Sequence, residues 1–280
     1  MQSSYTAAHA KERLGGEANL PDTVSYAERE LALATGRIKY LEQGSGAPVV
    51  VLHHSWGSPG WLPFHERLAE SHRVIAPDLP GWGGSERPAW AREPRDIAIL
   101  VGRLLDGVDL DEVKLVGLGF GGYIAAELAT MNPSRLHSLT LIGAAGLKPD
   151  QGEITDQMML SHRAYIEESF RDHDTYVRFL GDEEPPEEVR QLWDFSREMT
   201  ARVTWKPYMF NRRLAPLLPD IKVPTLLIWG EQDAIVPLVC ARQFEAGIPD
   251  AKLELVAGAG HVVEIEEPER TADLIAGFPG

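Results

Sequence analysis

The sequence predicts an α/β protein built on a mostly parallel, doubly wound sheet with a helical insertion. Short apolar runs alternate with amphipathic stretches along most of the chain. The apolar runs are continuous instead of alternating with polar residues, which is typical of strands that helices cover on both faces. A charged and aromatic segment without such a run separates two of the strands. An all-helical insertion between strands fits these observations most simply.

The predicted elements follow in order along the chain. Residues 1–23 are polar and alanine-rich, and we interpret them as an N-terminal arm with little core of its own. A hairpin over 28–43 opens the sheet. We assign 24–146 and 217–280 to the sheet core and 147–216 to the helical insertion, called the cap below. Predicted buried strands lie at 49–52, 74–76, 113–117, 139–142, 225–229 and 253–256, and predicted cap helices at 156–170, 174–179, 187–199 and 204–213.

Composition limits the partners of the chain. A chain of 280 residues is long enough for one large domain with an insertion, and its net charge of -15 argues against nucleic acid or an anionic membrane as the main partner. The single cysteine, Cys240, cannot form an internal disulfide, and no cysteine–histidine spacing suggests a metal or another cofactor. No signal-peptide pattern and no bilayer-length apolar run occur, so we expect a cytoplasmic protein. A homodimer has only base rates in its favour.

The segment around Gly119 has the form of a sharp strand–turn–helix corner that presents a nucleophile. A buried strand is predicted directly before it and a helix directly after it. Gly117, Gly121 and Gly122 are small enough to let the two backbones approach each other. The pattern for such a corner is G-x-S-x-G, with the serine hydroxyl as nucleophile. Gly119 stands where that serine is expected, so the corner lacks the hydroxyl.

The chain resembles the capped α/β-hydrolase superfamily over residues 24–278. The motifs that carry the resemblance occur in the family's order at 50–54, 76–85, 117–122, 227–233 and 258–261. The resemblance implies an α/β-hydrolase fold with a helical cap. It also implies that Asp233 is the acid, that His261 is the base and that Gly119 holds the nucleophile position. In such a pair the acid fixes the tautomer of the imidazole, which then removes a proton.

The loop after the strand at 49–52 departs from the family pattern. Similar hydrolases usually carry His-Gly there, whereas this chain has His53, His54, Ser55 and Trp56 in succession. A side chain at position 54 alters the expected oxyanion hole, although the N–H of Phe120 remains as one donor. We interpret His53 as a buried, hydrogen-bonded structural residue. His54, Ser55 and Trp56 are expected to line the substrate pocket.

The cap is expected to close the pocket from above, because ligands of open α/β sheets collect at the carboxyl ends of the strands. Trp205 and Tyr208 are its predicted contributions to the pocket, whereas most other cap aromatics are expected to pack among themselves. An apolar lining with a few polar groups predicts a small, mostly apolar substrate with a carbonyl or hydroxyl group.

Several functions remain open at this point. The leading hypothesis is an atypical hydrolase in which His261, oriented by Asp233, activates a water in the space above Gly119 to cleave an ester, a lactone or a C–C bond. Ser55 is a less favoured displaced nucleophile. The alternatives are a catalytically silent ligand-binding protein, a lyase or isomerase of the same fold, and a hydrolase inactivated by an engineered serine-to-glycine replacement. Restoring serine at position 119 is expected to raise esterase activity at some cost in stability.

Overall fold

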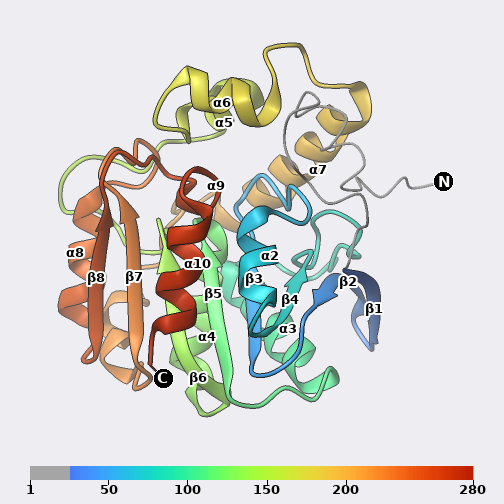
Figure 1. Cartoon of the computed structure of the whole chain (residues 1–280), viewed down its shortest axis with the longest axis vertical. Coiled ribbons are helices and arrows are strands. Elements are labelled where there is room, and N and C mark those ends of the chain that lie inside the picture. Colours follow the sequence, from blue (N-terminus) through green and yellow to red (C-terminus); the bar gives the residue numbers. More distant parts are fainter. Residues whose placement is uncertain (1–25, 280) are drawn as a thin grey trace.

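One sheet of eight strands crosses the part of the molecule that the computed structural model describes, residues 26–279. The predicted N-terminal arm lies outside these residues. The strands are β1 (Ala27–Leu33), β2 (Gly36–Gln43), β3 (Pro48–Leu52), β4 (Arg73–Pro77), β5 (Val113–Leu118), β6 (Leu136–Ile142), β7 (Thr225–Gly230) and β8 (Ala251–Val256). Their order is β1-β2-β4-β3-β5-β6-β7-β8 (Figure 1). β2 pairs antiparallel with both β1 and β4, and the remaining pairs are parallel. The predicted sheet is confirmed.

Helices cover both faces of the sheet (Figure 1). Outside the cap they are α2 (Pro63–Ala69), α3 (Pro94–Gly107), α4 (Phe120–Met131), α8 (Leu238–Gly247), α9 (Val263–Glu266) and α10 (Pro268–Gly277), with 3₁₀ turns η1 (Pro133–Arg135) and η2 (Ala215–Asp220). α2 packs on α10, and α3 packs on α4. Val49 and Val51 of β3 share one apolar cluster with Phe64 of α2, whereas Val50 and Leu52 belong to the cluster on the other face. This division explains why the strands read as continuous apolar runs.

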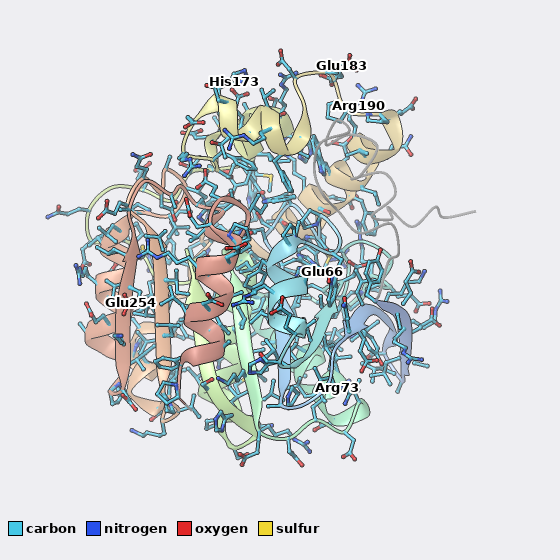
Figure 2. The ribbon with its side chains drawn as sticks, viewed as in Figure 1. Glu66, Arg73, His173, Glu183, Arg190 and Glu254 are labelled. Atoms are coloured by element: carbon cyan, nitrogen blue, oxygen red, sulfur yellow. The ribbon has the colours of Figure 1, made fainter. Side chains whose placement is uncertain are left out.

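The cap consists of three helices between β6 and β7. They are α5 (His162–Glu168), α6 (His173–Leu180) and α7 (Glu187–Thr204). α5 and α6 lie beyond one end of the sheet in Figure 1. Figure 2 shows His173, Glu183 and Arg190 on the outer side of the cap, so much of its charge belongs to its surface. No helix within residues 26–279 is long and apolar enough to cross a bilayer.

Two predicted cap helices differ from the structure. The helix expected over 156–170 begins only at His162, because the Ser161 hydroxyl accepts the Ala164 N–H at 3.1 Å and caps the helix there. The helix expected over 204–213 is wrong. α7 continues to Thr204, and the chain then turns. Pro207 lacks an N–H and disfavours helical geometry in the residue before it, which ends the helix at this point.

The corner after β5 requires glycine at several positions. Gly119 is the residue before α4 and has φ 52° and ψ -108°, a backbone conformation that side chains disfavour. A Cβ at Gly117 would lie 2.5 Å from the Gly121 carbonyl oxygen, and a Cβ at Gly121 would overlap the Leu52 carbonyl. The glycines therefore allow α4 to start directly against β3 and β5.

We predict that Gly121→Ala lowers the free energy of unfolding by about 1–3 kcal/mol, because the added methyl group meets backbone atoms that cannot move independently. Gly102→Ala in α3 is the matched control. A Cβ there would meet only Leu128 Cδ1 at 3.4 Å, and replacing glycine inside a helix adds up to about 1 kcal/mol. Urea unfolding of both variants checks the prediction. Equal stabilities would contradict the close packing described for the corner.

Candidate active site

His261 and Asp233 form a buried pair at the carboxyl edge of the sheet. Asp233 follows β7 and His261 follows β8, so the two parallel strands deliver both residues to the same edge. Asp233 Oδ2 lies 2.9 Å from His261 Nδ1, and Asp233 Oδ1 accepts the Ile235 and Val236 N–H groups at 2.9 and 2.8 Å. The carboxylate is thus fixed by three hydrogen bonds. We assign the imidazole proton to Nδ1, which leaves a lone pair on Nε2.

Gly143 supports this pair from below. It follows β6 directly and has φ 53°. A Cβ at this position would lie 2.9 Å from His261 Nδ1 and 3.2 Å from Asp233 Oδ2. Only glycine at position 143 therefore leaves enough room for the side chains of Asp233 and His261. Gly143 was not predicted from the sequence, although a glycine directly after a strand that neighbours the corner is a usable signal.

The loop that carries His261 is attached to the cap. The His261 N–H donates to the Ser169 carbonyl oxygen at 2.8 Å, at the end of α5. Glu266 accepts the Arg171 N–H at 2.7 Å through one carboxylate oxygen and the Gly260 N–H through the other. Burial raises the pKa of Glu266, while these two N–H groups oppose the rise. The position of His261 therefore depends on cap and core together.

His54 occupies the place where a nucleophile side chain would stand. A Cβ added to Gly119 would lie 2.5 Å from His54 Nδ1 and 2.9 Å from His261 Nε2. The two imidazole rings have centroids 5.0 Å apart. The space expected above Gly119 is therefore bordered by both imidazole rings, and a side chain at position 119 would collide with His54. The missing side chain at position 119 and the additional ring at position 54 belong to one arrangement.

A second carboxylate, Glu264, holds His54. Glu264 Oε1 lies 3.0 Å from His54 Nε2, and the two side chains are 1% and 2% exposed. The ring also stacks on Trp56 at 5.8 Å with an interplanar angle of 10°. Within the described residues, His54 Nδ1 and Glu264 Oε2 have no hydrogen-bond partner. Glu264 was missed because it lies in an acidic run that reads as solvated surface. Its place three residues after His261, at the start of α9, was the available signal.

His53 differs from its neighbour, since both of its ring nitrogens are used. Nε2 accepts the Leu79 N–H at 3.0 Å, which leaves the proton on Nδ1 to be donated to the His54 carbonyl oxygen at 2.7 Å. Burial lowers its pKa to about 4. The interpretation of His53 as a buried, hydrogen-bonded residue is confirmed.

Of the remaining predicted pocket residues, Ser55 and Tyr208 are connected to each other, whereas Trp205 lies apart. The Ser55 hydroxyl donates to Gln157 Oε1 at 3.0 Å, and the Tyr208 hydroxyl accepts the Gln157 N–H at 3.0 Å. Ser55 and Tyr208 thus meet through Gln157, a cap residue that the sequence analysis missed because an isolated glutamine carries no pattern. Trp205 does not join them. It lies directly after α7 and is 66% exposed, so it faces solvent.

Phe120 presents a free backbone N–H at the corner after β5. It is the first residue of α4, so its N–H has no partner inside the helix. Its side chain is buried against Trp82, with ring centroids 5.2 Å apart. The start of a helix favours negative charge, and this N–H is a fitting donor for an oxyanion. Among residues 26–279, no group of three or more histidine, cysteine, aspartate or glutamate side chains could hold a metal ion.

We predict that Gly119→Ser alone destabilises the protein by about 1–3 kcal/mol, because its Cβ meets His54 and its backbone has positive φ. Combining it with His54→Gly removes the obstructing ring and restores the His-Gly pattern that similar hydrolases carry. We expect a fluorophosphonate probe to label the introduced serine in the double variant more strongly than in the single one. Equal labelling would show that His54 does not exclude a side chain at position 119.

We also predict that stability falls as the pH drops from 6.5 towards 4. Burial lowers the pKa of His53 to about 4 and that of His65 to about 3, so the unfolded chain takes up their protons first. Asp78 and Glu266 act in the opposite direction, because burial raises the pKa of Asp78 to about 6 and that of Glu266 above its usual value, so the folded state binds their protons first. Burial also lowers the pKa of His72 and His162. The four histidines together outweigh the two acids. His65→Gln should make the loss of stability on acidification smaller, as measured by urea unfolding at each pH; an unchanged pH dependence would contradict this.

Comparisons with known proteins agree with the fold. Residues 48–268 match the family described as alpha/beta hydrolase fold. The chain is 31% identical to a 2-hydroxymuconate semialdehyde hydrolase of Pseudomonas sp. (strain CF600), over 93% of this chain and 96% of the relative. It is 27% identical to a 2-hydroxy-6-oxononadienedioate/2-hydroxy-6-oxononatrienedioate hydrolase of Paraburkholderia phymatum, over 87% and 91% of the two chains.

A solved structure agrees at the level of the fold. The 2-hydroxy-6-oxo-6-phenylhexa-2,4-dienoate hydrolase of Rhodococcus sp. strain RHA1 superposes with a TM-score of 0.74 at 22% identity, over 90% of this chain and 98% of that one. The predicted fold is confirmed, and the chain belongs to the α/β-hydrolase family.

Proposed function

We propose that the protein hydrolyses small, neutral carbonyl compounds by direct attack of a water that His261 deprotonates. The observation that carries the proposal is the intact Asp233–His261 pair, whose free Nε2 lies 2.9 Å from the Cβ position of Gly119. No covalent intermediate forms on the protein in this reaction. General-base catalysis of this type contributes about 10²–10⁴-fold to a rate.

The surroundings of His261 suit the charges that develop. As Nε2 takes a proton from water, the Asp233 carboxylate stabilises the imidazolium that forms. The oxygen of the attacked carbonyl gains negative charge, which the Phe120 N–H at the start of α4 would stabilise. Ser55 is not favoured as a displaced nucleophile, because its hydroxyl donates to Gln157.

The class of substrate follows from charge and from the relatives. The net charge of -15 and the two carboxylates beside the imidazoles disfavour a substrate with several negative charges. The names of the two relatives describe hydrolases of 2-hydroxymuconate semialdehyde and of 2-hydroxy-6-oxononadienedioate or 2-hydroxy-6-oxononatrienedioate, which are unsaturated oxo acids. From these relatives we carry over the cleavage of a C–C bond beside a carbonyl group and not the negative charge of the named substrates. Among the ester, lactone and C–C hypotheses, we therefore favour C–C bond hydrolysis of a neutral ketone.

The arrangement also bears on the other hypotheses. If glycine had been engineered in place of a native serine, the neighbouring residues would leave room for a serine side chain at position 119. Here the His54 ring lies 2.5 Å from the Cβ position instead. Glu264 and Trp56 hold that ring in place. These contacts favour a glycine that belongs to this site. The oriented Asp233–His261 pair favours catalysis over silent binding, in which the pair would serve only to hydrogen-bond the ligand.

We predict that His261→Ala and Asp233→Asn each lower kcat/KM for the hydrolysis of esters and 1,3-diketones by about 10²–10⁴-fold, because water loses its base or the base loses its orientation. His137→Gln is the matched control, since His137 lies on β6 and pairs with Glu112 at the surface. Steady-state assays of the three variants check this. Full activity in His261→Ala, or tight binding of these compounds without turnover by the unaltered protein, would overturn the proposed function.

A further inference from the structure

We propose that His54, held by Glu264, is the general acid of the same reaction and gives a proton from Nδ1 to the leaving group. The inference rests on the proposed function, in which His261 is the base. His261 then removes a proton from water, and His54 supplies a proton to the departing atom.

The free nitrogens of the two imidazoles lie around one point of the site. Nδ1 of His54 and Nε2 of His261 lie 2.5 and 2.9 Å from the same point, the Cβ position of Gly119. Each imidazole is held by a carboxylate at its other nitrogen, at 3.0 Å for His54 and 2.9 Å for His261. The site thus contains two buried histidine–carboxylate pairs whose free nitrogens face each other. A substrate carbonyl above Gly119 would be within reach of both.

His54 differs from its neighbour His53 in the hydrogen bonds of its ring nitrogens. Both rings are buried in the same loop, but both nitrogens of His53 have partners, whereas Nδ1 of His54 has none among the residues described. A buried polar atom without a partner costs about 1–3 kcal/mol. A ring that served only for packing would bring no gain in return for this loss of stability. The unpartnered atom faces the reacting centre, which is where a substrate would supply the partner.

The proton transfers balance as follows. Nε2 of His261 takes a proton from water, and the water oxygen forms a bond to the carbonyl carbon. The bond between that carbon and the leaving group then breaks, and its electron pair goes to the leaving atom, which takes the proton from Nδ1 of an imidazolium at His54. The proton on Nε2 of His261 afterwards passes to Nδ1 of His54, since both nitrogens lie within 2.9 Å of the Cβ position of Gly119. The net reaction adds one water, and no other reactant is consumed.

A nucleophilic role for His54 is less consistent with the contacts. Nδ1 is the ring nitrogen next to the carbon that carries Cβ, so a covalent bond there is more crowded than at Nε2. Stacking on Trp56 and the Glu264 hydrogen bond hold the ring in one plane. A proton can leave such a fixed ring without any movement of heavy atoms.

An acid at this position matters most for poor leaving groups. An alkoxide or the carbanion from a ketone needs a proton as it departs, whereas 4-nitrophenolate leaves without one. The inference therefore narrows the substrate class to carbonyl compounds with a basic leaving group, which includes the C–C bond of a ketone.

The test compares two esters that share an acyl group, ethyl butanoate and 4-nitrophenyl butanoate, and adds benzoylacetone as a diketone. We expect His54→Gln to lower kcat/KM for ethyl butanoate and benzoylacetone by about 10²-fold or more, and for 4-nitrophenyl butanoate by less than about fivefold. Glu264→Gln should show the same dependence on the leaving group with a smaller effect, because Glu264 positions the acid. Glu266→Gln in the same helix is the matched control and should change both esters by one common factor.

Each outcome has a distinct meaning. Equal losses for both esters in His54→Gln and Glu264→Gln would overturn the acid role, and so would a larger loss for 4-nitrophenyl butanoate, which indicates a nucleophile. If circular dichroism shows that His54→Gln does not fold, the same comparison is made with Glu264→Gln and His54→Asn. The quantity compared is the loss of kcat/KM for ethyl butanoate relative to the loss for 4-nitrophenyl butanoate. A His261→Ala variant with full activity on all three compounds, or no turnover by the unaltered protein, contradicts the proposed function itself and is separable from these results.

Discussion

The close approach of His54 to Gly119 is the contact on which the rest of the site depends. Nδ1 lies 2.5 Å from the Cβ position of Gly119, so a side chain at 119 and the imidazole at 54 exclude each other in this arrangement. The imidazole therefore lies where a side chain at position 119 would stand. Glu264, in α9, stabilises the ring at its other nitrogen.

The fold provides these contacts through its parallel strands. β3, β5, β6, β7 and β8 end at one edge, and the residues that follow them are His53 and His54, Gly119, Gly143, Asp233 and His261. Glycines at the corner and below the Asp233–His261 pair allow backbone and imidazoles to pack closely. The cap adds a further constraint, because Ser169 holds the backbone of His261. A change in cap position would therefore move the base.

The sequence predicted the sheet, the cap and the Asp233–His261 pair, since strand patterns are local and the family order of motifs places the two residues. It did not predict Glu264 as the partner of His54, because the pairing joins positions 210 residues apart and a glutamate in an acidic run resembles solvated surface. Trp205 was assigned to the pocket as an aromatic residue of the cap, which was expected to cover the strand ends, whereas it lies directly after α7 and is 66% exposed. Side-chain direction after a turn is set by backbone geometry that composition does not reveal.

The central claim is that water attacks the substrate directly, without a covalent intermediate on the protein. Mass spectrometry of the intact protein, quenched within milliseconds of mixing with 4-nitrophenyl butanoate, measures this most directly. The account predicts a single species with the mass of the unmodified chain throughout turnover. A species heavier by one butanoyl group, formed and lost at the rate of turnover, would contradict it.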